Sequence, residues 1–144
     1  MGCTSSDAGT VNQPGKGAKN ELIEVTYFNI GHGRADPIKQ MLAHANANWK
    51  FHGETFETWG ARKASGKTAE FGALPIIKQG DKTYDLSIPS MRVLAMQLGY
   101  YPGDDWKKAA VVDMISETYS DVFNLWSGTL ISEDKTNAEK AKVF

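Results

Sequence analysis

The sequence predicts an α/β fold in which strands and helices follow in the order βαβαββα, with one long helix after them. Three observations support this. Two early segments with alternating apolar residues flank a helical pattern. A turn at Gln79-Gly80-Asp81 joins two later strand-like segments into a hairpin. A crossover helix between the first two strands requires parallel pairing, and the hairpin adds an antiparallel pair. This is the layout of a thioredoxin-like fold.

Each element has a sequence signal. In the first helix, Ile38, Leu42 and Ala45 share one face, and Pro37 lies in the first turn, where a missing N–H costs little. The helix after the hairpin is expected to have Ser87 as its N-cap. The predicted strands cover about 22–28, 49–55, 74–78 and 82–85, and the predicted helices cover about 34–45, 56–63 and 87–98, with the long helix starting near 104.

The long helix carries an apolar stripe whose members follow alternating steps of three and four, which places them on one face. These residues are Val112, Ile115, Tyr119, Val122 and Trp126. The tail from residue 132 is polar and rich in charged residues. A stripe of this size would be a liability on an isolated chain. It therefore predicts a partner, or a further segment that covers it.

Composition excludes several classes of function. A net charge of -1 over 144 residues gives no basic field that would attract nucleic acid. No apolar run approaches the roughly 18 residues that a membrane-spanning helix needs. The single cysteine, Cys3, excludes an internal disulfide and a CxxC redox pair. Any chemistry on sulfur must therefore use a sulfur of the ligand, and we expect no metal site.

The N-terminus carries a second signal. Gly2 after Met1, with Ser6 at the required position, fits the pattern for N-myristoylation, and Cys3 would take a palmitoyl chain. Two acyl chains hold a protein stably at a membrane. The alternative is an unmodified disordered leader, since residues 4–20 offer nothing to bury. We expect a cytoplasmic protein, which acylation would tether to the cytoplasmic face of a membrane.

The turn from Tyr27 to Asp36 is the strongest site signal. A strand stops at Tyr27, a Gly-rich turn follows, and an amphipathic helix begins with Arg34 in its first turn. The phenol and the guanidinium are expected to face one site. Helix N-termini favour anions, so this junction predicts a negatively charged ligand.

Three landmarks resemble the N-terminal domain of glutathione S-transferases, most closely the sigma class and its relatives with a catalytic tyrosine. The landmarks are Thr26–Asn29 leading to Gly33–Asp36, Phe71–Pro75, and Ser87 opening a helix that contains Arg92. The likeness spans about 22–101 and weakens towards Trp126. It implies three parts: a flexible tether over 1–20, a thioredoxin-like glutathione-binding domain over 21–101, and over 102–144 a linker with the first part of a helical domain.

The resemblance implies a catalytic role for two residues. Tyr27 would donate a hydrogen bond to the sulfur of glutathione, and Arg34 would support the site. A thiol of pKa about 8.5 is a poor nucleophile at neutral pH until its thiolate is stabilised. A hydrogen bond to the charged form lowers the pKa, and the thiolate then attacks an electrophilic carbon. Without the other landmarks, Tyr27 would be interpreted as an ordinary core tyrosine.

The resemblance also implies a set of contacts to the rest of glutathione, which is the expected co-substrate. Trp59 and Lys63 would meet its glycine carboxylate, Leu74 would pair with its cysteinyl backbone before a cis Pro75, and Ser87 would bind its γ-glutamyl carboxylate. Asp121 would reach glutathione in the neighbouring subunit of a homodimer or larger assembly formed through the long helix. The plain alternatives are a half-buried tryptophan, an N-cap serine and solvated charges.

Departures from the family pattern leave two hypotheses open. Leu86 replaces the usual glutamine, Ala73 replaces a polar residue, and the stretch from Tyr27 to Arg34 is one residue longer than usual. Loss of two polar contacts would weaken binding by about ten- to several-hundred-fold. The first hypothesis is an enzyme that joins glutathione to a small electrophile. The second is a catalytically weakened module whose long helix docks on a partner, which the end of the chain at Phe144 also favours.

Overall fold

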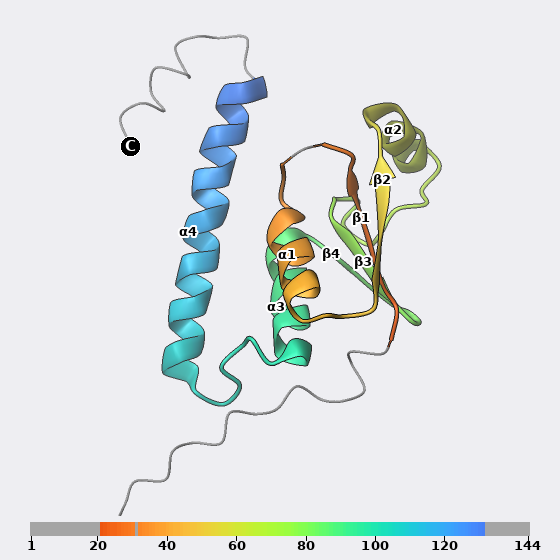
Figure 1. The fold of residues 1–144 in the computed structure, drawn as a ribbon. Helices are drawn as coiled ribbons and strands as arrows, with labels where there is room; N and C mark the ends of the chain where they lie inside the picture. Colours follow the sequence, from red (N-terminus) through yellow and green to blue (C-terminus); the bar gives the residue numbers. More distant parts are fainter. Residues whose placement is uncertain (1–20, 31, 132–144) are drawn as a thin grey trace, which may run out of the picture.

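A computed structural model describes residues 21–30 and 32–131, and its elements follow the predicted order (Figure 1). This confirms the α/β fold class. The predictions about Gly2, Cys3, the tether and the polar tail concern residues outside the described ranges. The elements are β1 (Ile23–Phe28), α1 (Asp36–His44), β2 (Trp49–Glu54), α2 (Phe56–Ala64), β3 (Ile76–Gln79), β4 (Lys82–Asp85), α3 (Ser87–Leu98) and α4 (Trp106–Ile131).

The four strands form one sheet in the order β2-β1-β3-β4. β1 pairs with β2 in parallel, whereas β3 runs antiparallel to both β1 and β4. The predicted parallel pair and the predicted hairpin are both confirmed. The register aligns Tyr27 with Gly53, Thr26 with Ile76, and Ile76 with Asp85. The ends of β1, β2 and β4 and the start of β3 therefore meet at one edge of the sheet.

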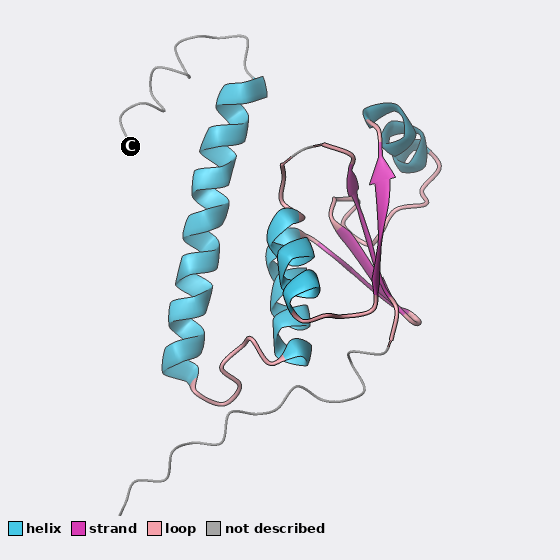
Figure 2. Cartoon of the chain, viewed as in Figure 1, coloured by secondary structure: helices cyan, strands magenta, loops and turns pink. Residues whose placement is uncertain are grey.

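Helices α1 and α3 lie together on one face of the sheet, and α4 lies beyond them, whereas α2 lies on the other side (Figures 1 and 2). The core fills the space between the sheet and the two covering helices. Ile38 and Leu42 of α1 are fully buried, as their spacing predicts, and Leu94 and Leu98 supply the buried face of α3. The remaining core residues are Ile23, Val25, Tyr27, Ala35, Ala45 and Ile77.

Two helix starts differ from the sequence expectation. Helix α1 begins at Asp36, so Arg34 precedes it instead of lying in its first turn. Helix α3 begins at Ser87, but its N-cap is Leu86, with φ 66°, and no side-chain cap is present. The expectation that Ser87 is the N-cap was therefore wrong. The chain turns from β4 into α3 through the left-handed backbone of Leu86, which leaves Ser87 as the first helical residue.

Helix α4 is joined to α3 by polar contacts near its N-terminal half. Arg92 Nε lies 2.9 Å from a carboxylate oxygen of Asp113, and the Tyr101 hydroxyl donates to the other oxygen at 3.1 Å. Burial, and then Asp113, raise the pKa of Tyr101. Within 21–30 and 32–131, no helix is long and apolar enough to cross a membrane.

The predicted apolar stripe of α4 is largely exposed. Ile115 and Val122 are 65% and 61% exposed, and Met114 beside them is 63% exposed. These residues line an open apolar groove of about 530 Å³ together with Thr118 and Tyr119. Most of the stripe is therefore exposed, and only Val112 and Tyr119 within it are partly buried.

Candidate functional site

Tyr27 stands at the sheet edge where the strand ends meet. Its side chain is only 7% exposed, and its ring packs directly against Gly33. A Cβ at Gly33 would lie 2.4 Å from Tyr27 Cε1, which no real contact allows. The backbone N–H of Arg34 donates to the Tyr27 hydroxyl oxygen at 3.0 Å. Because the oxygen accepts this bond, the phenolic O–H is left as a donor for a ligand.

The turn before α1 is closed by an internal carboxylate. Gly33 N–H donates to Asp36 at 2.8 Å, and Lys39 Nζ lies 2.6 Å from the other carboxylate oxygen. Burial would raise the pKa of Asp36, but the hydrogen bonds from Lys39 and Gly33 outweigh it and lower that pKa. Asp36 therefore already binds one N–H group of this turn, and the expectation that the junction takes a negatively charged ligand stays a prediction.

The side chain of Arg34 points to α4. Its Nη1 donates to Ser120 Oγ at 3.3 Å, and its Nη2 donates to Asn124 Oδ1. The guanidinium also lies over the ring of Phe123, 4.9 Å from the centroid. The guanidinium therefore binds α4, and the expectation that it faces one site with the phenol stays a prediction. It is the Arg34 backbone that meets Tyr27, while the guanidinium has its partners 86 and 90 residues away.

Tyr119 of α4 comes near the same corner. Its pKa is raised, chiefly by burial and then by the charge of Asp36, and the Arg34 guanidinium opposes this. Tyr27 contributes to the same electrostatic environment. Helix α4 therefore reaches the corner through its contacts with Arg34, and Tyr119 lies near them, although the predicted contribution of α4 was Asp121. Asp121 lies beside Ser120 on α4 and is exposed.

The loop before β3 is tied to the end of β4. The N–H of Phe71 donates to the carboxylate of Asp85 at 2.8 Å, and Asp85 is 8% exposed. The Leu74–Pro75 bond is cis, as the resemblance implies. Ser87, which is also 8% exposed, follows β4 at the same edge. The structure thus brings Leu74, Pro75 and Ser87 to the sheet edge that carries Tyr27.

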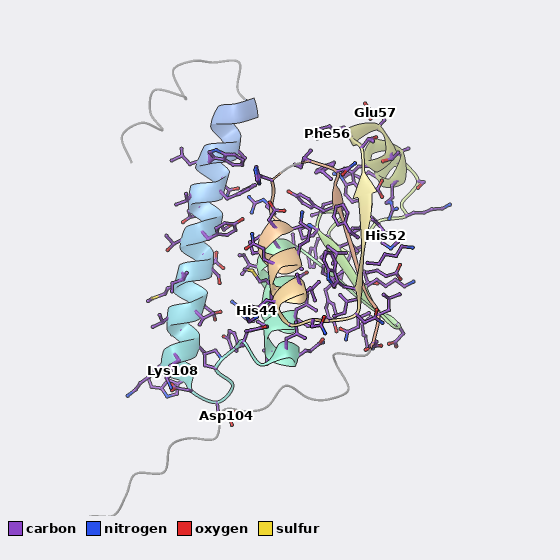
Figure 3. The ribbon with its side chains drawn as sticks, viewed as in Figure 1. His44, His52, Phe56, Glu57, Asp104 and Lys108 are labelled. Atoms are coloured by element: carbon purple, nitrogen blue, oxygen red, sulfur yellow. The ribbon has the colours of Figure 1, made fainter. Side chains whose placement is uncertain are left out.

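Helix α2 starts at this edge too, directly after β2 (Figure 3). Thr55 and Thr58 form a capping box that begins the helix. Arg62 binds the buried carboxylate of Glu54 at 2.6 Å, which holds α2 to the end of β2. Trp59 is almost buried, and Lys63 is exposed with its Nζ 6.0 Å from the Trp59 ring centroid.

Sequence reasoning missed several residues that build this corner. Gly33 was part of the turn landmark, but its packing on the Tyr27 ring was not predicted, and Asp85 was not singled out, because both contacts depend on packing and on the strand register. Helix periodicity places the α4 residues on one face, at steps of three and four, but nothing in the sequence joins that face to Arg34. These missed α4 residues are Ser120, Phe123 and Asn124.

The geometry defines a thioredoxin-like α/β domain with a polar site at one sheet edge and a long helix against it. Comparison with known proteins supports a more specific statement. Glutathione S-transferase P of Capra hircus is 33% identical over 100 residues, which are 68% of this chain and 45% of that protein. A probable glutathione S-transferase 6 of Caenorhabditis elegans is 32% identical over 101 residues, with 70% and 47% covered. No protein-family model matches the chain.

Solved structures give the same result. A Nu-class GST from Haemonchus contortus is 34% identical with a TM-score of 0.61, over 72% of this chain and 48% of that chain. A sigma-class GST of Fasciola hepatica, at 21% identity, shares the fold with a TM-score of 0.70 over 86% and 59%. The chain belongs to the glutathione S-transferase family, as the landmarks predict, and has its fold. It spans about half the length of the curated relatives that it matches.

Proposed function

We propose that the chain binds glutathione at the sheet edge around Tyr27 and activates its thiol for attack on a small electrophile. The observation that carries this proposal is the Tyr27 hydroxyl, which accepts the Arg34 N–H at 3.0 Å and keeps its own O–H to donate. A sulfur placed against this O–H would have its thiolate stabilised. The thiolate is the nucleophile, and the sulfur–carbon bond forms as the leaving group departs from the electrophile with its electron pair.

The surrounding residues have the chemistry to hold the rest of the tripeptide. In this proposal Lys63 and the indole N–H of Trp59 meet the glycine carboxylate, and the Leu74 backbone pairs with the cysteinyl unit. Ser87 lies at the start of α3, where backbone N–H groups and the helix dipole favour a carboxylate such as the γ-glutamyl group. Asp121 of α4 is exposed and would serve a site in a second copy.

The test combines binding and turnover. Calorimetry measures glutathione binding, and a chlorodinitrobenzene-type electrophile reports conjugation. Tyr27→Phe keeps the packed ring and removes the O–H. Because a hydrogen bond to a charged group contributes about 1.5–3 kcal/mol, we expect kcat/KM to fall by about ten- to a hundredfold with little change in the Kd for glutathione. Tyr84→Phe on β4 is the matched control.

Two outcomes contradict the proposal. If millimolar glutathione does not bind, the site assignment is wrong. If glutathione binds without turnover and Tyr27→Phe changes nothing, the chain acts as a binding module. The latter outcome would fit the substitutions at Leu86 and Ala73, which remove polar side chains that the family usually has.

We also propose two properties of the whole protein that rest on the sequence pattern: assembly into a homodimer through α4, and acylation of Gly2 and Cys3. The first is supported by the exposed apolar face of α4. The second is tested by the intact mass of protein from its native cells. An unmodified Gly2 there would remove the acylation proposal.

A further inference from the structure

We propose that α4 positions the thiol-activating corner through Arg34, with Ser120 and Asn124 as the positioning residues. The consequence for the thiol rests on the proposed function. The placement of the Arg34 backbone does not, and it can be measured without glutathione.

Arg34 joins two parts of the molecule. Its backbone N–H donates to the Tyr27 hydroxyl oxygen at 3.0 Å, within the β1–α1 turn. Its guanidinium is held by α4, where Ser120 Oγ and Asn124 Oδ1 accept from separate nitrogens. Arg34 therefore contacts Tyr27 through its backbone and α4 through its side chain. A shift of α4 would move the Arg34 backbone N–H, which binds the catalytic hydroxyl.

Residues of α4 restrain the Arg34 guanidinium both along its edge and across its face. Two acceptors one helical turn apart bind its two terminal nitrogens, and the ring of Phe123 covers its face at 4.9 Å. A planar guanidinium bound along its edge and stacked on its face has little freedom to rotate. The side chain therefore restrains the backbone of Arg34 relative to α4.

A competing source of order lies within the turn itself. Gly33 N–H is bound by Asp36 at 2.8 Å, and Gly33 packs on the Tyr27 ring. If this were sufficient to place the Arg34 N–H, release of the guanidinium would leave the bond to Tyr27 unchanged. The two possibilities differ in a single measurable property, the protection of the Arg34 amide proton.

The bond from Arg34 to Tyr27 also affects the chemistry. A hydroxyl that accepts a hydrogen bond at its oxygen becomes a better donor through its own O–H, because the two bonds polarise each other. Loosening the Arg34 N–H would weaken the O–H as a donor to the sulfur. The pKa of the bound glutathione thiol would then rise and kcat near neutral pH would fall, while contacts that set the KM for glutathione remain.

The experiment uses the full chain with Ser120→Ala, Asn124→Leu and their combination. Asn124→Asp keeps an acceptor for the guanidinium, so this variant should match the native protein in amide exchange and in the thiolate titration. Glu117→Gln, at an exposed position on α4, is the control for a surface change on the same helix. Exchange of the Arg34 amide proton is followed by NMR in protein without glutathione, and the pH dependence of thiolate absorbance is followed in protein with glutathione.

We expect the combined variant to exchange the Arg34 amide about three- to tenfold faster, which corresponds to loss of a typical hydrogen bond. The thiolate titration should move to higher pH and kcat should fall, with the KM for glutathione unchanged. Asn124→Asp and Glu117→Gln should match the native protein. Unchanged amide exchange in the combined variant, with helix content retained, would overturn the proposal.

A second outcome would also overturn it, namely faster exchange with an unaltered thiolate titration, because α4 would then place the amide without affecting the chemistry. Failure of the proposed function has a different signature. If no form binds glutathione but exchange of the Arg34 amide rises in the combined variant, the mechanical coupling of α4 to Arg34 is supported and only the glutathione assignment is lost.

Discussion

The ring of Tyr27 occupies the space that a side chain at position 33 would need, so this position requires glycine. Replacement by alanine would place a Cβ 2.4 Å from Tyr27 Cε1 and 2.9 Å from its hydroxyl oxygen. The ring or the turn must move, and such overpacking typically costs about 1–3 kcal/mol. We therefore expect Gly33→Ala to lower the free energy of unfolding by that amount in a denaturant titration, and to reduce glutathione conjugation because the hydroxyl is displaced.

Gly60 provides the control for this substitution. It lies inside α2, and a Cβ there would meet nothing within 4 Å. Gly60→Ala should be neutral or should stabilise by up to about 1 kcal/mol, since alanine is the better helix former. Equal effects of the two substitutions would show that the Tyr27 contact is not what makes Gly33 necessary.

Leu86 holds a backbone conformation that suits glycine better than leucine. Its φ is 66°, and its side chain is partly exposed, so little packing would be lost on truncation. Leu86→Gly should raise the free energy of unfolding by about 1 kcal/mol through relief of this strain. Leu86→Ala keeps the left-handed backbone with a Cβ and should bring no such gain. A denaturant titration that ranks alanine above glycine would contradict the explanation.

At the scale of single residues, the site residues could be predicted from the sequence, but some of their contacts could not. The tyrosine at the strand end and the serine at the start of α3 could be found from their landmarks. The direction of the Arg34 side chain could not, because its partners are 86 and 90 residues away and are ordinary polar residues of a helix. Ser87 was predicted as the N-cap from its residue type, but the N-cap of α3 is Leu86, whose φ is positive.

At the scale of elements, Asp36 links the turn after β1 to the start of α1. Its carboxylate accepts from Gly33 N–H and pairs with Lys39 one turn into the helix. The pKa of Asp36 is lowered in the folded protein despite its partial burial. A lowered pKa means that this carboxylate stabilises the fold above its unfolded pKa, and that the contribution is lost as the pH falls through the folded pKa.

We therefore expect Asp36→Ala to lower the free energy of unfolding near neutral pH by about 1–3 kcal/mol, since two charge-assisted contacts are lost. The difference from the native protein should shrink as the pH falls below about 4, where the unfolded-state carboxyl is protonated. Denaturant titrations at a series of pH values measure this. Asp104→Ala, at an exposed position before α4, should show neither the loss nor its pH dependence. A loss that is constant with pH would assign the effect of Asp36→Ala to packing.

The helices and strands themselves could largely be predicted from hydrophobic periodicity. Ile38, Leu42 and Ala45 were expected on one buried helix face and are buried. The hairpin and the crossover helix constrain the strand directions, so the pairing followed from general rules. The first turns of α1 and α3 were harder to predict, because the backbone hydrogen bond to Asp36 and the conformation of Leu86 decide how these helices begin.

For the whole molecule, the unusual feature is the exposed apolar face of α4. Met114, Ile115 and Val122 are each more than half exposed and line the same groove. Contiguous apolar surface of this kind marks interaction sites in soluble proteins. Because the groove extends along one face of a straight helix, a second copy could place its own α4 against it, with the same residues on both sides of a two-fold axis.

This arrangement predicts association that charged substitutions on the groove would abolish. Sedimentation equilibrium of the native chain should show a dimer, whereas Ile115→Asp combined with Val122→Asp should give a monomer. Two buried carboxylates per copy would face their symmetry mates without partners, and an unpaired buried charge is strongly unfavourable. Met96→Asp on α3, also at an exposed apolar position, is the matched control and should leave the dimer intact.

Circular dichroism verifies that the helix content is unchanged in these variants. A native chain that is monomeric at high concentration would contradict the dimer, and a dimer unaffected by both substitutions would place the interface away from α4.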